Sequence, residues 1–322
     1  IELYNPNAQK KGNLTLQPVY SSTEKLKQFS LDTKGIQRLQ TVLLDSVIPD
    51  IEETVPEYLL KKHRLIARQK ALLNIHFPES NQLLEAAQKR LKFDEFFFIQ
   101  LRLLKNKLLR TQKFKGVIFS AVGEKFNSFY NEKLPFDLTG AQKRVIKEIR
   151  ANTQKGIQMN RLLQGDVGSG KTVVALMSML LAIDNGYQAC IMAPTEILAQ
   201  QHYHSIKELV GDDFIQIDLL TGSTKKKKRT ILHRQLENGE LNILIGTHAL
   251  IEDAVQFQNL GLVVIDEQHR FGVEQRAKLW RKNSVPPHIL VMTATPIPRT
   301  LAMTLYGDLD VSIINELPVG RK

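Results

Sequence analysis

Residues 31–111 have the periodicity of amphipathic helices. Apolar residues recur at three- and four-residue spacing with basic residues between them, which is typical of helices that bury one face. Prolines at positions 49, 56 and 78 mark the boundaries between segments. This pattern predicts helices over residues 35–47, 57–75 and 81–109. The preceding residues 1–30 hold short extended segments such as GNLTLQPVY with turn formers around them, and we expect the end of a small β domain there.

The pattern changes at Leu134. Short apolar runs now alternate with amphipathic segments, and each run ends in glycine, proline, a small polar residue or acidic residues. Near-continuous apolar runs separated by helices predict an α/β lobe with a parallel sheet that is covered on both faces. The six runs are residues 161–165, 188–194, 215–222, 241–247, 260–267 and 288–295. The chain is therefore expected to hold three parts, with boundaries at 1–30, 31–133 and 134–322.

A glycine-rich loop follows the first of these runs. The sequence GDVGSGKT fits G-x-x-x-x-G-K-[ST], the phosphate loop, between a strand and a helix. Its glycines let consecutive N–H groups face one anion, and the following helix adds its positive end. We expect Lys171 to reach the β- and γ-phosphates of a nucleotide and Thr172 to ligate Mg²⁺. The expected nucleotide-binding residues of the loop are Gly165, Asp166, Val167, Gly168, Ser169, Gly170, Lys171 and Thr172.

Acidic and hydroxyl side chains follow two further runs. In LVVIDEQH we expect Asp266 to hold Mg²⁺ through water and Glu267 to polarise an attacking water, which makes Lys171, Asp266 and Glu267 the candidate catalytic residues. His269, two residues beyond Glu267, is a candidate link between the nucleotide and a polymer site. In MTATPIPRT, Thr293 and Thr295 are placed to sense the phosphate state by hydrogen bonding.

The net charge makes a polyanion a candidate partner. The chain carries a formal charge of +11, and residues 1–133 hold 22 Lys and Arg against 14 Asp and Glu, which gives +8. An excess of this size attracts and steers polyanions, although charge alone does not identify one. No apolar run reaches the roughly 18 residues that a membrane span needs, so no membrane partner is expected. The single cysteine, Cys190, lies in an apolar run and favours a reducing, intracellular location.

The motifs together resemble the first motor lobe of superfamily 2 helicases, which has a RecA-like fold. APTEILAQQH, TGS and GTHAL match the strand-contacting motifs of that superfamily. The resemblance implies that Thr195, Gly222 and Thr247 contact the nucleic-acid backbone, with no sequence information in those contacts. FDLTGAQ resembles the adenine-reading segment, which implies that Gln142 binds the adenine edge and that Phe136 packs near the base.

A narrower resemblance is to the RecG family of branched-DNA helicases. It rests on IGTHALI, VVIDEQHRFGVEQR and MTATPIPRTLAMTLYGDLDVSIINELPVGR, and on RLKFDEFFFIQL upstream of the motor. LTLQPVYSSTEKL resembles the exit from the family's wedge, an oligonucleotide-binding β-barrel. The resemblance implies an ATP- and Mg²⁺-dependent helicase or translocase that regresses stalled forks and migrates Holliday junctions. It also implies a monomer in the bacterial cytoplasm, associated with the nucleoid. The transcription-repair coupling factor shares the motor motifs but not the helical lead-in.

We expect the chain to be a fragment, because it begins without methionine and stops at ELPVGRK, where the family's second motor lobe begins. That lobe carries the arginine finger, so the fragment alone is expected to bind nucleotide and not to unwind DNA. Two alternatives remain open. An RNA helicase of the same superfamily is compatible with the motor motifs, and a non-catalytic nucleic-acid scaffold is opposed by the intact Lys171, Thr172, Asp266 and Glu267.

Overall fold

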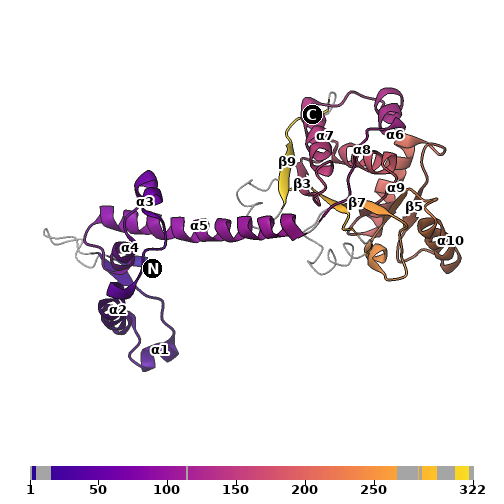
Figure 1. Ribbon diagram of the computed structural model, residues 1–322. Helices are drawn as coiled ribbons and strands as arrows, with labels where there is room; N and C mark the ends of the chain where they lie inside the picture. The colour runs from indigo at the N-terminus through magenta and orange to yellow at the C-terminus, as the bar shows by residue number, and fades with distance from the viewer. Residues whose placement is uncertain are drawn as a thin grey trace. The chain divides into compact units, whose positions relative to one another are not determined.

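The computed structural model describes residues 2–4, 16–113, 115–266, 282, 285–295 and 309–318. It divides the chain into two compact units, Ile1–Arg102 and Leu103–Lys322, which are drawn in Figure 1. Within the described ranges, no helix is both long enough and apolar enough to cross a membrane.

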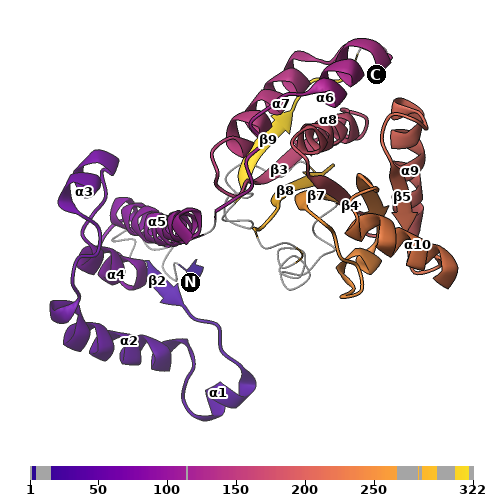
Figure 2. The same ribbon diagram turned by 45° about the vertical axis from the view of Figure 1, so that its right-hand side comes forward.

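The second unit is built on a parallel sheet of seven strands in the order β5-β6-β4-β7-β8-β3-β9. Figure 2 shows part of this order, from β9 through β3, β8 and β7 to β4. The strands are β3 (Asn160–Gly165), β4 (Gln188–Met192), β5 (Ile217–Leu220), β6 (Ile243–Gly246), β7 (Leu260–Asp266), β8 (His288–Thr293) and β9 (Asp310–Ile314). The prediction of an α/β lobe with a parallel sheet is confirmed. All six predicted runs form strands, and β9, which the apolar pattern did not predict, pairs with β3.

Helices connect the strands and cover the sheet. They are α6 (Glu124–Ser128), the π-helix η2 (Phe129–Lys133), α7 (Gly140–Thr153), α8 (Lys171–Asp184), α9 (Glu196–Val210), α10 (Lys226–Glu237) and the 3₁₀ helix η3 (His248–Ile251). α7, α8 and α9 pack on one face, where they meet strand residues such as Leu163 and Val264. α10 and η3 pack on the other face against Leu162 and Val263, which precede Leu163 and Val264 in the same strands. Successive strand residues therefore enter opposite cores, as a sheet buried on both faces requires.

The single cysteine lies inside this sheet. Cys190 in β4 is fully buried, and burial raises the pKa of its thiol to about 12. The side chain is therefore a neutral, packed group, as its apolar surroundings in the sequence predicted.

The first unit is mostly helical. Its elements are β1 (Glu2–Tyr4), β2 (Gln17–Val19), α1 (Glu24–Gln28), α2 (Thr33–Val47), the 3₁₀ helix η1 (Ile48–Asp50), α3 (Glu57–His63), α4 (Arg68–His76) and α5 (Asn81–Lys113). β1 and β2 pair antiparallel. α5 continues beyond Arg102 into the second unit. The predicted helical periodicity is confirmed for α2 and α5.

The predicted helix over residues 57–75 is instead two helices, α3 and α4. Arg64 ends α3 in the left-handed conformation at φ 51°. The N–H of Leu65 then donates to the carbonyl of Leu60 at 2.9 Å, which is the hydrogen bond of a Schellman-type helix end. Apolar spacing did not reveal this break because both helices keep apolar residues at helical intervals.

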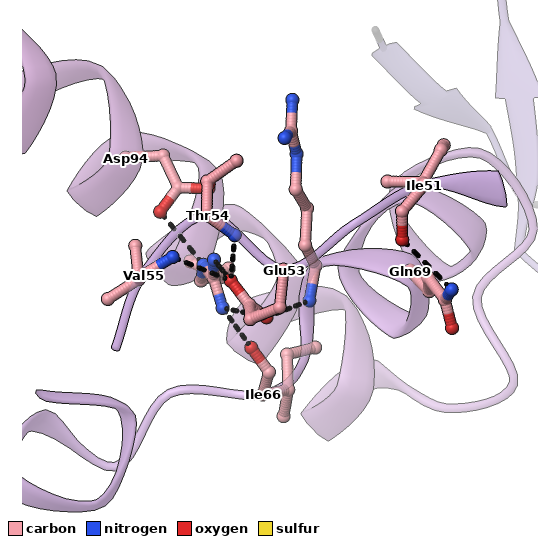
Figure 3. A network of polar contacts seen from close by, with 9 residues as sticks. Ile51, Glu53, Thr54, Val55, Ile66, Gln69 and Asp94 are labelled. Carbon is pink, nitrogen blue, oxygen red and sulfur yellow. Dashed lines mark hydrogen bonds and ion pairs between the residues drawn. The ribbon is translucent and has the colours of Figure 1, made fainter. Parts of the chain in front are cut away.

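A buried ion network ties the first unit together. Arg90 on α5 is 0% exposed and donates to both carboxylate oxygens of Glu53, to Asp94 at 2.8 Å and to the carbonyl of Ile66 at 2.7 Å. Glu53 also accepts the N–H groups of Thr54, Val55 and Arg68. Figure 3 shows the polar groups converging on Glu53. The network therefore joins the loop before α3, the loop before α4 and α5.

Replacing Arg90 tests how much this network contributes. Arg90→Ala leaves Glu53 and Asp94 without their shared cation, and breaking a buried pair in this way costs about 3–5 kcal/mol. We expect faster hydrogen exchange in peptides from residues 53–94, measured by mass spectrometry. Lys61→Ala is the control, because Lys61 forms an exposed pair with Glu57 and such pairs contribute about 0–1 kcal/mol. Equal protection in both variants would contradict the prediction.

The same network predicts a pH dependence. Burial alone would raise the pKa of Glu53, but hydrogen bonds from Arg90, Val55 and Arg68 lower it from 4.5 to about 2. A lowered pKa contributes stability that is present above the unfolded value and lost as the pH falls toward the folded one. Glu53→Gln should therefore lower the urea midpoint of unfolding at neutral pH. The difference in midpoint between this variant and the unsubstituted protein should become smaller as the pH falls from 4.5 toward about 2. A difference independent of pH would refute this assignment.

Candidate nucleotide-binding site

The predicted phosphate loop lies at the carboxyl end of β3, between β3 and α8. Gly168 and Gly170 have φ of 83° and 84°, a region that favours glycine. A Cβ at Gly165 would lie 2.5 Å from Ser169 Oγ. Gly165 and Gly170 are the two glycines that the motif specifies, and Gly168 is a third position whose backbone conformation favours glycine.

Lys171 lies across this loop. Its Nζ donates to the carbonyls of Gly165 at 2.7 Å and Asp166 at 2.9 Å. α8 begins at Lys171 without a side-chain cap, so the positive end of its dipole faces the loop. Ser169 Oγ is buried and has no hydrogen-bond partner among the described residues. The ammonium group, the helix end and the unsatisfied hydroxyl fit an anionic phosphate group. Of the other loop residues, Val167 is 84% exposed and Thr172 is partly buried.

Gln142 binds the loop from α7. Its Nε2 donates to the Ser169 carbonyl at 2.8 Å and its Oε1 accepts the N–H of Thr139 at 2.9 Å, which completes a capping box. In the structure its amide thus holds the loop, and adenine binding by Gln142 stays a prediction. Phe136 is 42% exposed. Glu316, after β9, accepts the N–H of Ala141 at 2.9 Å and is a contact that the sequence did not reveal.

The sheet order brings the predicted acidic and hydroxyl residues to the loop. β8 lies between β3 and β7, with Thr293 opposite Gln164 on one side and Met292 opposite Asp266 on the other. Thr293 Oγ1 and Thr295 Oγ1 are 2.8 Å apart. These hydroxyls therefore lie at the strand end between the phosphate loop and Asp266. Glu267 and His269 lie outside the described residues.

A histidine that the sequence analysis did not select contacts Asp266. His202 on α9 places Nε2 2.7 Å from Asp266 Oδ2. His202 ends the quoted motif APTEILAQQH, but nothing in the sequence pointed to its partner 64 positions away.

The three predicted DNA-contacting residues lie after neighbouring strands. Thr195 caps α9 by accepting the N–H of Leu198. Gly222, after β5, is exposed. Thr247, after β6, is 2% exposed, and its Oγ1 has no hydrogen-bond partner in the described part of the chain.

Two charged residues hold the loop at 221–224 and were also missed. Glu196 accepts the Ser223 hydroxyl at 2.8 Å and the Ser223 N–H at 3.2 Å, and hydrogen bonds from the Ser223 hydroxyl and from nearby N–H groups lower its pKa. Arg229 on α10 donates to the carbonyls of Thr221 and Thr224 and to Glu252. The loop thus has one charged partner from α9 and one from α10.

The family model and the named relatives that match this chain are all helicases. The DEAD/DEAH box helicase family matches residues 139–304. The chain is 50% identical over 305 residues to the ATP-dependent DNA helicase RecG of Synechocystis sp., covering 95% of this chain and 36% of that protein. It is 43% identical over 333 residues to the ATP-dependent DNA helicase RecG of Aquifex aeolicus, covering 100% and 41%. A solved structure of RecG bound to a three-way DNA junction aligns with a TM-score of 0.77 at 40% identity, covering 96% of this chain and 40% of that one.

The chain spans between 36% and 45% of the lengths of the first curated relatives that it matches.

The geometry of the loop predicts the effect of adding one methyl group. In Gly170→Ala the new Cβ would lie 2.3 Å from Gln142 Nε2, in addition to the strain of φ 84°. Because Gln142 holds the Ser169 carbonyl, we expect this variant to displace the loop and to weaken nucleoside triphosphate binding in an equilibrium titration.

Gly186→Ala is the matched control. Gly186 has φ 79° with nothing within 4 Å of an added Cβ, so it bears the same backbone cost of about 1–2 kcal/mol without the collision. Equal nucleotide affinity in the two variants would show that the contact with Gln142 does not matter.

Proposed function

The chain belongs to the DEAD/DEAH box helicase family and is similar to RecG helicases along almost its whole length, and from this premise we propose that it is part of an ATP-dependent DNA helicase that remodels branched DNA. The observation that carries the proposal is that the phosphate loop after β3, which Lys171 contacts from the start of α8, lies at the same sheet edge as Thr293 at the end of β8 and Asp266 at the end of β7. In this proposal residues 134–322 are the first motor lobe, 31–133 the helical region before it and 1–30 the end of a wedge domain.

The motor lobe would bind ATP with Mg²⁺. Lys171 would hold the β- and γ-phosphates, and Thr172 and Asp266 would hold the metal. Bound ATP supplies the free energy for movement, and Mg²⁺ neutralises charge on its phosphates. Glu267 would polarise the attacking water. Gln142 and Phe136 would contact the adenine, with Gln142 keeping its bond to the loop.

The state of the nucleotide would be passed to DNA by residues at neighbouring strand ends. Thr293 and Thr295 lie between the phosphate loop and Asp266, and together with His269 they are the proposed coupling residues. Thr195, Gly222 and Thr247 would contact the DNA backbone, where hydroxyl and N–H groups position a strand without reading its sequence. The basic character of the chain supports a polyanionic partner.

Branched duplex DNA is the proposed substrate. The solved structure reported above is described as RecG bound to a three-way DNA junction, and its alignment over 96% of this chain supports the same class of substrate here. The proposed reactions are the regression of stalled forks and the migration of Holliday junctions. The proposed setting is the bacterial cytoplasm at the nucleoid, with the protein acting as a monomer.

ATP hydrolysis by the protein in its full natural length tests this function. It should be measured with model forks, linear duplex DNA, single-stranded DNA and duplex RNA at one salt concentration, because affinity for nucleic acids depends strongly on salt. We expect forks to stimulate hydrolysis most. Lys171→Ala should abolish nucleotide binding and hydrolysis, whereas Lys143→Ala, an exposed lysine on α7, should leave both unchanged.

Stimulation by duplex RNA alone would overturn the branched-DNA proposal and keep the phosphate-loop assignment. Nucleotide binding by Lys171→Ala at the level of the unsubstituted protein would overturn the assignment of the loop itself.

A further inference from the structure

We infer that His202 is a positioning residue for Asp266, and that α9 connects this carboxylate to the loop at 221–224 through Glu196. The inference rests on the proposed function, because it concerns the same Mg²⁺-binding carboxylate and DNA-contacting loop.

The first contact fixes the orientation of Asp266. His202 Nε2 and Asp266 Oδ2 are 2.7 Å apart, and the two side chains are only 12% and 13% exposed. An ionised carboxylate only accepts hydrogen bonds, so Nε2 must carry the proton that bonds to it. Oδ1 then remains for a cation or its bound water. Hydrogen-bond partners of metal-binding carboxylates orient them, and losing such a partner typically costs 10- to 100-fold in metal affinity or activity.

The second contact lies at the start of the same helix. Glu196 is the first residue of α9, and its two oxygens accept the hydroxyl and the N–H of Ser223. Glu196 Oε1 also lies 3.0 Å from the position of a Cβ at Gly222, so the carboxylate packs closely on the loop backbone. The predicted DNA-contacting loop is therefore attached to α9 by a charged group.

One rigid element carries both contacts. His202 follows Glu196 by six positions, which corresponds to about 9 Å along the helix axis and about 120° around it. The two side chains can therefore reach different parts of the sheet edge. Ala199, Ile206 and Val210 fix α9 in the core below, and closely packed helices move as bodies instead of deforming locally.

The topology explains why α9 reaches both sites. It starts after β4, which is the direct neighbour of β7 and of Asp266, and it leads to β5 at the edge of the sheet. The loop at 221–224 follows β5. A displacement of this loop by a DNA strand would thus shift α9 and, through His202, the carboxylate of Asp266.

The first experiment measures binding without hydrolysis. In the full-length protein and without DNA, binding of a fluorescent ATP analogue is titrated at graded Mg²⁺. His202→Ala should raise the Mg²⁺ concentration for half-maximal binding by about 10- to 100-fold. His202→Gln should restore part of the loss, because its amide can donate to Asp266. His204→Ala is the control, since His204 is an exposed histidine on the same helix. An unchanged Mg²⁺ dependence in His202→Ala would overturn the role of His202.

The second experiment tests the connection through α9. The ratio of fork-stimulated to DNA-free hydrolysis is measured for His202→Ala, Glu196→Ala and the double variant. If α9 connects the two contacts, each single variant should lower this ratio. The fold-decrease in the double variant should be smaller than the product of the two single fold-decreases. Independent, multiplying losses would overturn the connection.

These outcomes are separable from failure of the proposed function. If DNA does not stimulate the unsubstituted protein, the proposed function fails, while the Mg²⁺ titration still decides the role of His202. Thermal unfolding would reveal whether His202→Ala folds poorly. In that case the role of His202 is decided by comparing the Mg²⁺ dependence of nucleotide binding in His202→Gln with that in His204→Ala.

Discussion

Burial of the parallel sheet on both faces is the constraint on which the second unit depends. Strand residues enter one core or the other, and the interiors of β3, β4, β6 and β8 are buried throughout. Polar groups without partners are costly inside such a sheet, and the predicted site residues lie where the strands end. Parallel strands all end at the same edge of the sheet. The strand direction alone therefore places the phosphate loop, Thr293 and Asp266 at one edge.

Hydrogen bonds from the helices then orient the groups at this edge. Gln142 on α7 holds the Ser169 carbonyl, His202 on α9 holds Asp266, and Glu196 holds the loop at 221–224. In each case the bonding side chain comes from a helix packed on the core, and its partner lies at a strand end or in a loop. Rigid helices thereby impose geometry on segments that lack regular structure of their own, which is what a binding site needs.

The first unit is stabilised differently. Among its described residues the fully or nearly buried hydrophobic side chains are few, namely Leu44, Val55, Ala71 and Ala87. The largest fully buried side chain there is Arg90. Its bonds to Glu53, Asp94 and Ile66 join segments that the small apolar core does not hold together. This arrangement makes the unit sensitive to the loss of one partner, because an unpaired buried charge is strongly destabilising.

The sequence by itself determined the parallel sheet, the helical region and the position of the phosphate loop, because apolar periodicity and glycine spacing are local signals. It also placed Asp266, Thr293 and Thr295 at strand ends. Only the tertiary structure decided which helix side chains hold them. His202 and Asp266 are 64 positions apart, Glu53 and Arg90 are 37, and Glu196 and Ser223 are 27. Such pairs depend on strand order and helix packing, which the local pattern of a single segment does not determine. The break between α3 and α4 was missed because the left-handed conformation of Arg64 and the three residues after it interrupt the helix without interrupting the apolar spacing of the sequence.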